Sequence, residues 1–197
     1  MAGEISAEEL AALVDQIDRG EDPYQLPEVL IEDPEPASAP RPAPVAPEEL
    51  IAGEPVEPKI NESLYNQVMR LTVGEKIKLA LKGNRDARNI LIRDASHIVP
   101  RFVMQNPRIT DDEIVAVSRN RNIDADLLRI IGDDKEWGRN PQIRSALVGN
   151  PKTPIAVALK FVNSLSEREL RLLAKSKNIP SAVAGSAKRI LLARTGH

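Results

Sequence analysis

Few residues of this chain have the types and spacing that catalysis requires. His97 stands close to Asp94 and Ser96, a combination that can transfer protons. The same residues also read as the polar start of a helix, where Asp and Ser side chains cap free backbone amides, and we prefer that interpretation. The other histidine, His197, is the last residue, where we expect fraying. We therefore predict no catalytic histidine.

Adjacent carboxylates are the other candidates for chemistry. Asp111, Asp112 and Glu113 form one cluster, and Asp133 and Asp134 form another. Calcium loops need ligands at a longer, regular spacing with a fixed glycine, so we interpret both clusters as acidic first turns of helices. The sequence also lacks cysteine, Gly-rich phosphate loops and a G-x-S-x-G motif. We predict that the protein is not an enzyme and has no metal and no cofactor.

Charge is divided unevenly along the chain. Residues 1–59 hold 15 acidic and 3 basic residues, a formal charge of −12, whereas residues 60–197 carry +10. A stripe of basic side chains can bind carboxylates or phosphates. Three interpretations stay open: solvated helix faces, an acidic protein partner, and nucleic acid, against which the scarcity of aromatic residues counts. The candidate partner-binding residues are Arg85, Arg88, Arg129, Arg139, Arg144, Lys188 and Arg189.

The N-terminal arm combines one short helix with a proline-rich segment. Residues 6–18 predict an amphipathic helix that opens with a Ser6–Glu9 capping box. Residues 22–58 contain ten prolines and predict an extended, disordered acidic tether. The phrase Pro-Glu-x-Leu-Ile occurs there twice, at 27–31 and at 47–51, and is either a docking motif or a chance repetition in a solubilising tail. The candidate docking residues are Leu10, Leu13, Val14, Ile17, Leu30, Ile31, Leu50 and Ile51.

From about residue 61 the pattern changes to short runs of apolar residues at helical spacing, each eight to twelve residues long. Three further capping boxes, Thr72–Glu75, Thr110–Glu113 and Ser166–Glu169, mark helix starts. Several runs end in an apolar-x-x-Asn pattern, and we expect the Asn side chain to satisfy free backbone groups there. Trp137, between two helical units, is either a wedge between them or a binding anchor, and we favour the wedge.

One stretch carries a resemblance to a known family. Residues 144–154 (RSALVGNPKTP) resemble the unit of leucine-rich-repeat-variant proteins, in which an Asn-Pro-x-Thr-Pro turn joins short helices. The resemblance implies a stack of helical units in a right-handed superhelix, as in HEAT-type solenoids. It extends over residues 73–190 with an irregular period, and the cysteine-bound cluster of one branch of that family is impossible without cysteine. The resemblance implies no enzymatic activity.

These observations predict an all-α protein with three parts. We expect an amphipathic helix at 1–20, an acidic Pro-rich linker at 21–59 and a helical-repeat domain at 60–197, an irregular right-handed α-solenoid of about ten short helices. Without a signal peptide or a long apolar segment, we expect a cytoplasmic protein. The predicted function is a protein-interaction scaffold or adaptor that binds an acidic protein partner; the alternative is a nucleic-acid-binding repeat protein. The acidic arm is also expected to contact its own basic domain, and no membrane is expected as a partner.

Overall fold

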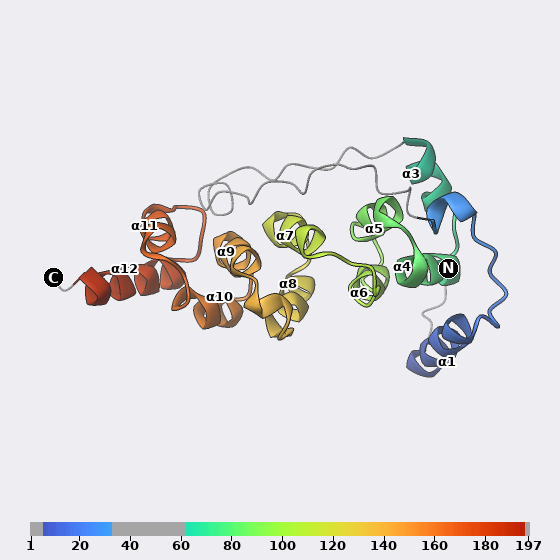
Figure 1. The fold of residues 1–197 in the computed structure, drawn as a ribbon, viewed down its shortest axis with the longest axis horizontal. Helices are drawn as coiled ribbons and strands as arrows, with labels where there is room; N and C mark the ends of the chain where they lie inside the picture. The colour runs from blue at the N-terminus through green and yellow to red at the C-terminus, as the bar shows by residue number, and fades with distance from the viewer. Residues whose placement is uncertain (1–5, 33–61, 196–197) are drawn as a thin grey trace. The chain divides into compact units, whose positions relative to one another are not determined.

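The computed structural model describes residues 6–32 and 62–195. Within these ranges the chain consists of α-helices and two short 3-10 helices and contains no β-strand, which confirms the predicted all-α class (Figure 1). The described residues belong to two compact units, formed by residues 6–32 with 62–109 and by residues 110–195. Residues of the N-terminal arm are therefore part of the first unit.

The first unit is centred on α4. Helix α4 packs against α5 and α6, α3 packs against α5, and α1 lies against α4. Ile77 and Leu79 of α4 and Leu91 of α5 are fully buried in this core. The helices are α1 (Ala7–Arg19), η1 (Glu28–Leu30), α3 (Glu62–Met69), α4 (Val73–Lys82), α5 (Arg85–Leu91) and α6 (Val99–Val103).

The second unit places alternate helices side by side. Helix α9 packs against α7, and α10 packs against α8 and α12, so that Figure 1 shows α7, α9 and α11 in one row and α8, α10 and α12 in another. Ile131, Ile143 and Leu147 are fully buried in this unit. Its helices are α7 (Asp111–Arg119), α8 (Ala125–Asp133), η2 (Trp137–Arg139), α9 (Pro141–Gly149), α10 (Ile155–Val162), α11 (Glu167–Lys175) and α12 (Ser181–Thr195).

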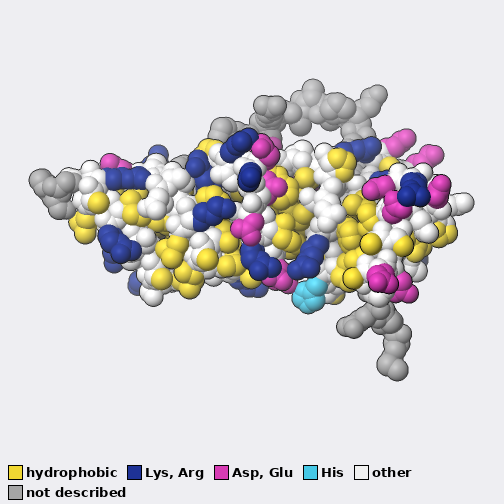
Figure 2. Space-filling model, turned by 90° about the horizontal axis from the view of Figure 1, so that it is seen from below, with side chains coloured by type: hydrophobic (Ala, Val, Ile, Leu, Met, Phe, Trp, Pro, Cys, Tyr) yellow, Lys and Arg dark blue, Asp and Glu magenta, His cyan; other side chains and the backbone are white. Residues whose placement is uncertain are grey.

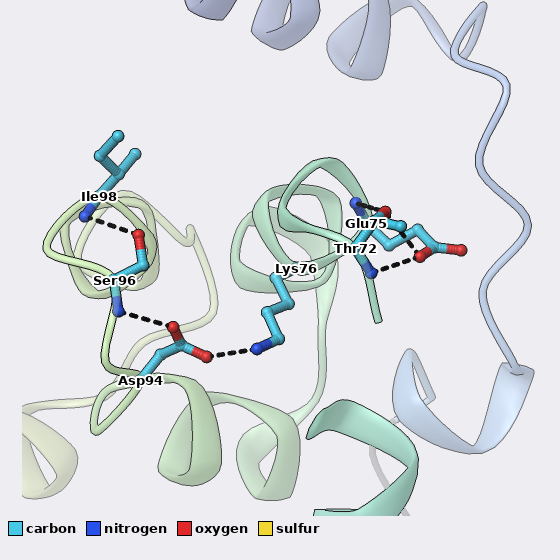
Figure 3. Close-up of polar contacts among 6 residues, drawn as sticks. All are labelled: Thr72, Glu75, Lys76, Asp94, Ser96 and Ile98. Atoms are coloured by element: carbon cyan, nitrogen blue, oxygen red, sulfur yellow. Dashed lines mark hydrogen bonds and ion pairs between the residues drawn. The ribbon is translucent and has the colours of Figure 1, made fainter. Parts of the chain in front are cut away.

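All four predicted capping boxes are confirmed. At the starts of α1, α4, α7 and α11, a Ser or Thr side chain accepts a hydrogen bond from the backbone of a Glu three residues on, whose side chain bonds back. Figure 3 shows the Thr72–Glu75 box. Hydrogen bonds from the Thr72 side chain and backbone hold the pKa of Glu75 below its usual value. An N-cap of this kind stabilises a helix by about 1 kcal/mol.

Three helices depart from the expected length of eight to twelve residues. Helix α5 has 7 residues, α6 has 5 and α12 has 15. Pro100 opens α6, and Pro107 follows soon after its end, so the prolines restrict the helix from both sides. No proline or asparagine interrupts residues 181–195, and α12 runs on as a longer helix.

A close approach of α8 and α10 gives a stability prediction. A Cβ atom at Gly132 would lie 2.3 Å from Cγ1 of Val157, and Lys160 Nζ donates to the Gly132 carbonyl oxygen at 2.7 Å. Gly132→Ala is therefore expected to lower the free energy of unfolding by about 1–3 kcal/mol, measured by urea denaturation, because the helices must separate.

Gly185→Ala is the matched control for Gly132→Ala. Gly185 lies within α12, and a Cβ atom added there would meet no other atom within 4 Å, so alanine is expected to stabilise the helix by up to about 1 kcal/mol. An equal gain in stability at both positions would contradict the close approach of α8 and α10.

Candidate peptide-binding site

The asparagines that end the helical runs join one helix end to another. Asn106, which follows α6, is 2% exposed. Its Nδ2 donates to the carbonyl oxygens of Ala80 at 2.8 Å and Gly83 at 3.2 Å, at the end of α4. Its Oδ1 accepts from the backbone amide of Arg108 at 2.9 Å. One amide side chain thus satisfies two carbonyls that α4 leaves free and orders the turn that follows α6.

Asn150, which follows α9 in the second unit, repeats this arrangement. It is 3% exposed, and its Nδ2 donates to the carbonyl oxygens of Ser118 at 2.7 Å and Asn120 at 3.0 Å, at the end of α7. Its Oδ1 accepts from the backbone amide of Lys152 at 3.0 Å. The expectation that these asparagines satisfy backbone groups is confirmed.

Asn84, which follows α4, makes the same contacts with the arm. Its Nδ2 donates to the carbonyl oxygens of Val29 at 2.8 Å and Glu32 at 2.9 Å, and its Oδ1 accepts from the amide of Ala87 at 3.0 Å. Its backbone amide also donates to the carbonyl oxygen of Leu30 at 2.8 Å. The Asn84 side chain therefore binds carbonyl oxygens of η1 and of the turn after it, as the Asn106 side chain binds carbonyl oxygens at the end of α4.

Two further contacts complete the seat of η1. The Leu30 side chain is fully buried, and Arg108 Nη1 donates to the carbonyl oxygen of Ile31 at 3.0 Å. We call Asn84 and Arg108, together with the surface that buries Leu30, the Asn84 site. The site takes four consecutive carbonyls of the arm and one leucine side chain, a combination that recognises a turn more than a particular sequence.

Helix α4 holds the segment before η1 through its lysines. Lys78 Nζ lies 2.8 Å from Oδ1 of Asp22, whose side chain is 1% exposed, and it also donates to the carbonyl oxygen of Tyr24. A Cβ atom at Gly74 would lie 2.1 Å from the Tyr24 hydroxyl oxygen, so the tyrosine ring rests directly on the helix backbone. Lys82 Nζ donates to the carbonyl oxygen of Ile17 at the end of α1.

The Asp22 carboxyl group is held in its charged form. Burial acts to raise its pKa, but hydrogen bonds from Lys78 and from the Tyr24 amide, together with the Lys78 charge, leave the pKa below the ordinary value of 3.8. A group whose pKa is lowered by folding contributes stability above its unfolded pKa and loses that contribution as the pH falls through its folded pKa.

This pKa shift predicts acid-sensitive docking of residues 6–32. Docking is expected to be complete above pH 3.8 and to weaken as the pH falls further, because protonated Asp22 no longer attracts Lys78. The NMR shifts of the Tyr24 ring report the transition, and far-UV circular dichroism separates it from unfolding. Asp22→Asn keeps the acceptor without the charge and is expected to remove the transition. The same transition in both proteins would contradict this assignment.

A second ion pair lies beside this region, within the first unit. Lys76 Nζ is 2.8 Å from Oδ2 of Asp94, with the two side chains only 12% and 6% exposed, and Oδ1 of Asp94 accepts from the Ser96 amide (Figure 3). The Ser96 hydroxyl in turn accepts from the Ile98 amide at 3.4 Å. Asp94 and Ser96 thus form the polar turn before α6, but the helix itself starts after Ile98 without a side-chain cap, so the prediction that these residues cap a helix is wrong. His97 is exposed.

The predicted basic residues are spread over both units. Arg88 is 3% exposed, and its Nη1 donates to the carbonyl oxygen of Gly83, so we leave it out of any binding surface. Arg129 and Arg139 are exposed but lie 3.7 Å from Asp126 and 2.8 Å from Glu136. On the face that Figure 2 shows, hydrophobic and acidic side chains lie among the lysine and arginine side chains. Arg85, Lys188 and Arg189 are exposed, and Arg144 is half-buried.

The predicted docking residues of the arm fall into three groups. Ile17 and Leu30 are fully buried in the first unit. Leu50 and Ile51 lie outside the described residues, as does His197. The remaining members, all half-buried, are Leu10, Leu13, Val14 and Ile31.

Other sequence expectations are resolved in the second unit. Asp111, Asp112 and Glu113 begin α7 as predicted, but Asp133 ends α8 and does not begin a helix. Helix α8 does not continue past this point, because the Asp134 side chain accepts hydrogen bonds from the backbone amides of Glu136 and Trp137. These bonds stabilise the turn that leads into η2. Helix η2 packs against α8 and α9 with Trp137 half-buried, as the wedge interpretation requires.

The Asn84 site itself does not follow from the sequence patterns. Asn84 has the sequence context of a helix-end residue, but its partners lie more than 50 positions earlier in the chain. The one sequence signal for the site is Asn84 itself, the first of the helix-end asparagines, together with Leu30, which lies between Pro27 and Pro34 in the arm.

Comparisons with protein-family models, with curated proteins and with solved structures give no match for this chain. Among the described residues, no three His, Asp or Glu side chains gather as candidate metal ligands. No helix in the part of the chain that the structure describes is both long and apolar enough to cross a membrane.

Proposed function

We propose that this protein is a non-enzymatic interaction scaffold whose helical surface binds an acidic segment of a protein partner. The supporting observation is the seating of residues 6–32 on the first unit. Lysine, arginine and asparagine side chains of that unit take backbone carbonyls and the Asp22 carboxylate of an acidic peptide. A partner segment with the same chemistry can use the same groups.

We further propose that the helices are units of a right-handed, HEAT-like α-solenoid. This proposal is supported by the common role of Asn84, Asn106 and Asn150. Each side chain donates from the end of its own helix to a carbonyl oxygen at the end of an earlier helical element. Stacked units of this kind leave long exposed walls suited to protein binding. In this arrangement η1 stands where a preceding repeat would end, and it closes the N-terminal face of the stack.

In this proposal, the arm competes with the partner for the same surface of the first unit. Residues 1–59 carry a formal charge of −12, and the remainder carries +10. A tethered competitor has a high effective concentration and is displaced only by a partner of greater affinity or by a change in the arm. We expect attraction between the two parts to weaken as salt increases, because exposed charges more than about 10 Å apart are screened at 0.1 M.

Affinity capture with the full-length protein tests the proposal. Gly74→Ala is the chosen variant, because its methyl group would collide with Tyr24 while alanine suits the helix interior. The variant is expected to retain more of an acidic protein partner than the wild type does, most clearly at about 50 mM salt. Gly185→Ala, with open space around it, is the control. Equal capture by all three proteins at low and high salt would overturn the proposal.

The nucleic-acid alternative gains no specific support. The exposed Arg129 and Arg139 each have a carboxylate beside them, which reduces the charge available to phosphates. Titration of the full-length protein with single-stranded and duplex DNA at about 50 mM salt distinguishes the two functions. A binding constant that falls steeply with salt would favour nucleic acid over the acidic protein partner.

A further inference from the structure

The arm carries a second copy of the motif that occupies the Asn84 site. The first motif, residues 27–31, reads PEVLI, and the second motif, residues 47–51, reads PEELI. We propose that the second motif binds the Asn84 site when the first motif is displaced from it. The inference concerns contacts within one chain, so it can fail without affecting the proposed binding of a partner.

The two motifs differ at a position that the site does not read. Val29 corresponds to Glu49, and the Val29 side chain is 67% exposed. Leu30, the side chain that the site buries completely, corresponds to Leu50. A charged side chain in place of Val29 would point into solvent, while the buried leucine is kept.

The polar contacts of the site also fit either motif. Asn84 takes the carbonyl oxygens of residues 29, 30 and 32, and Arg108 takes that of residue 31. Main-chain carbonyls are present whatever the side chain, so the change from Glu32 to Ala52 removes none of these hydrogen bonds. The second motif can therefore reproduce all four hydrogen bonds if it forms the same turn.

The second motif is also within reach. Asn84 caps the start of α5, and α3 packs against α5. Residues 52–61 connect the motif to α3, and ten residues can span up to about 33 Å. A helix with the length of α5 is only about 10 Å long, so this connection is long enough.

The order of preference follows from the residues before each motif. Asp22 and Tyr24, which Lys78 binds, correspond to Pro42 and Pro44. The second motif therefore lacks the buried ion pair, and we expect it to bind about 10-fold to 100-fold more weakly than the first. The first motif occupies the site in the intact chain, and the second takes it when the first is displaced.

Spin labelling of the full-length protein tests the exchange. The chain has no cysteine, so a single Glu49→Cys substitution carries one label at the position of the second motif that corresponds to Val29. In the otherwise wild-type chain the label is expected to leave the Asn84 side-chain NMR signal sharp. Adding Leu30→Asp, which expels the first motif, is expected to broaden that signal strongly. Val29→Cys, labelled at the exposed position of the seated motif, is the positive control and should broaden it directly.

A second measurement guards against a folding defect in Leu30→Asp. The Asn84 backbone amide donates to Leu30, so its hydrogen exchange reports occupancy of the site. We expect Leu30→Asp to keep at least about tenfold more protection at Asn84 than the double variant Leu30→Asp, Leu50→Asp, with equal protection in α7 to α12. Equal exchange at Asn84 in the two variants, or a sharp Asn84 signal in labelled Leu30→Asp, would overturn the inference.

Discussion

Asn150→Asp is expected to destabilise the protein more than any other isosteric change in the second unit. The carboxylate that replaces the amide would face the carbonyl oxygens of Ser118 and Asn120, which the amide nitrogen now meets at 2.7 and 3.0 Å. Both donated hydrogen bonds are lost, and a charge is buried where the side chain is 3% exposed. We expect the free energy of unfolding to fall by about 3–5 kcal/mol at neutral pH, measured by urea denaturation.

The pH dependence of Asn150→Asp separates charge from lost hydrogen bonds. Burial beside carbonyl oxygens would raise the pKa of the introduced carboxyl group, so the penalty is full above that raised value and shrinks as the pH falls toward about 3.9. Asn178→Asp, at an exposed position, is the control and is expected to change stability by less than about 0.5 kcal/mol. Similar losses in the two variants would show that Asn150 does not join α7 to the turn after α9.

The helix starts and ends could be predicted because their causes are local. A capping box needs only residues three positions apart, and all four predicted boxes form. The role of Asn106 and Asn150 at helix ends followed from the same kind of reasoning. The Asp133–Asp134 pair was not a helix start, because Asp133 ends α8 and the Asp134 side chain stabilises the turn that follows. Two adjacent carboxylates alone do not distinguish the end of a helix from its start.

The candidate site could not be predicted because its two sides are far apart in the sequence. Asn84 is separated by 55 and 52 residues from the carbonyls that it takes, and hydrophobic periodicity carries no information about such pairs. The charge split indicated that the arm and the helices attract one another, but not where. The actual contacts depend more on main-chain carbonyls and one buried leucine than on the total charge.

Arg88 illustrates why charge alone was a poor guide to the binding surface. Arg85 is exposed at the first position of α5, yet Arg88, three residues later in the same helix, is buried and donates to the carbonyl oxygen of Gly83. The Gly83 carbonyl oxygen also accepts from Asn106, so Arg88 and Asn106 satisfy the same helix end. An arginine in such a position stabilises the first unit and is not available to a partner.

The Asn84 site connects the proposed repeat architecture with the proposed function. In the proposed solenoid, Asn84 is a helix-end asparagine that binds η1 of the arm in place of the end of a preceding helical unit. The Asn84 side chain binds carbonyl oxygens of η1 and the residues after it as the Asn106 side chain binds those at the end of α4. In the proposed solenoid, such a site needs no additional side chains, only an end of the stack that no other helical unit covers.

Leu30→Ala is expected to release the docked arm without unfolding the helices. Leu30 is fully buried, and its truncation removes about 2–5 kcal/mol from a contact that residues 6–32 make with the first unit. In a Leu50→Asp background, where the second motif cannot take the site, hydrogen exchange at the Asn84 amide should accelerate by about 30-fold or more. Amides of α7 to α12 should keep their protection. Val29→Ala, at a side chain 67% exposed, is the control and should leave Asn84 protected. If Leu30→Ala accelerates exchange no more than Val29→Ala, or if every amide loses protection together, η1 is not a separable ligand of the helical surface.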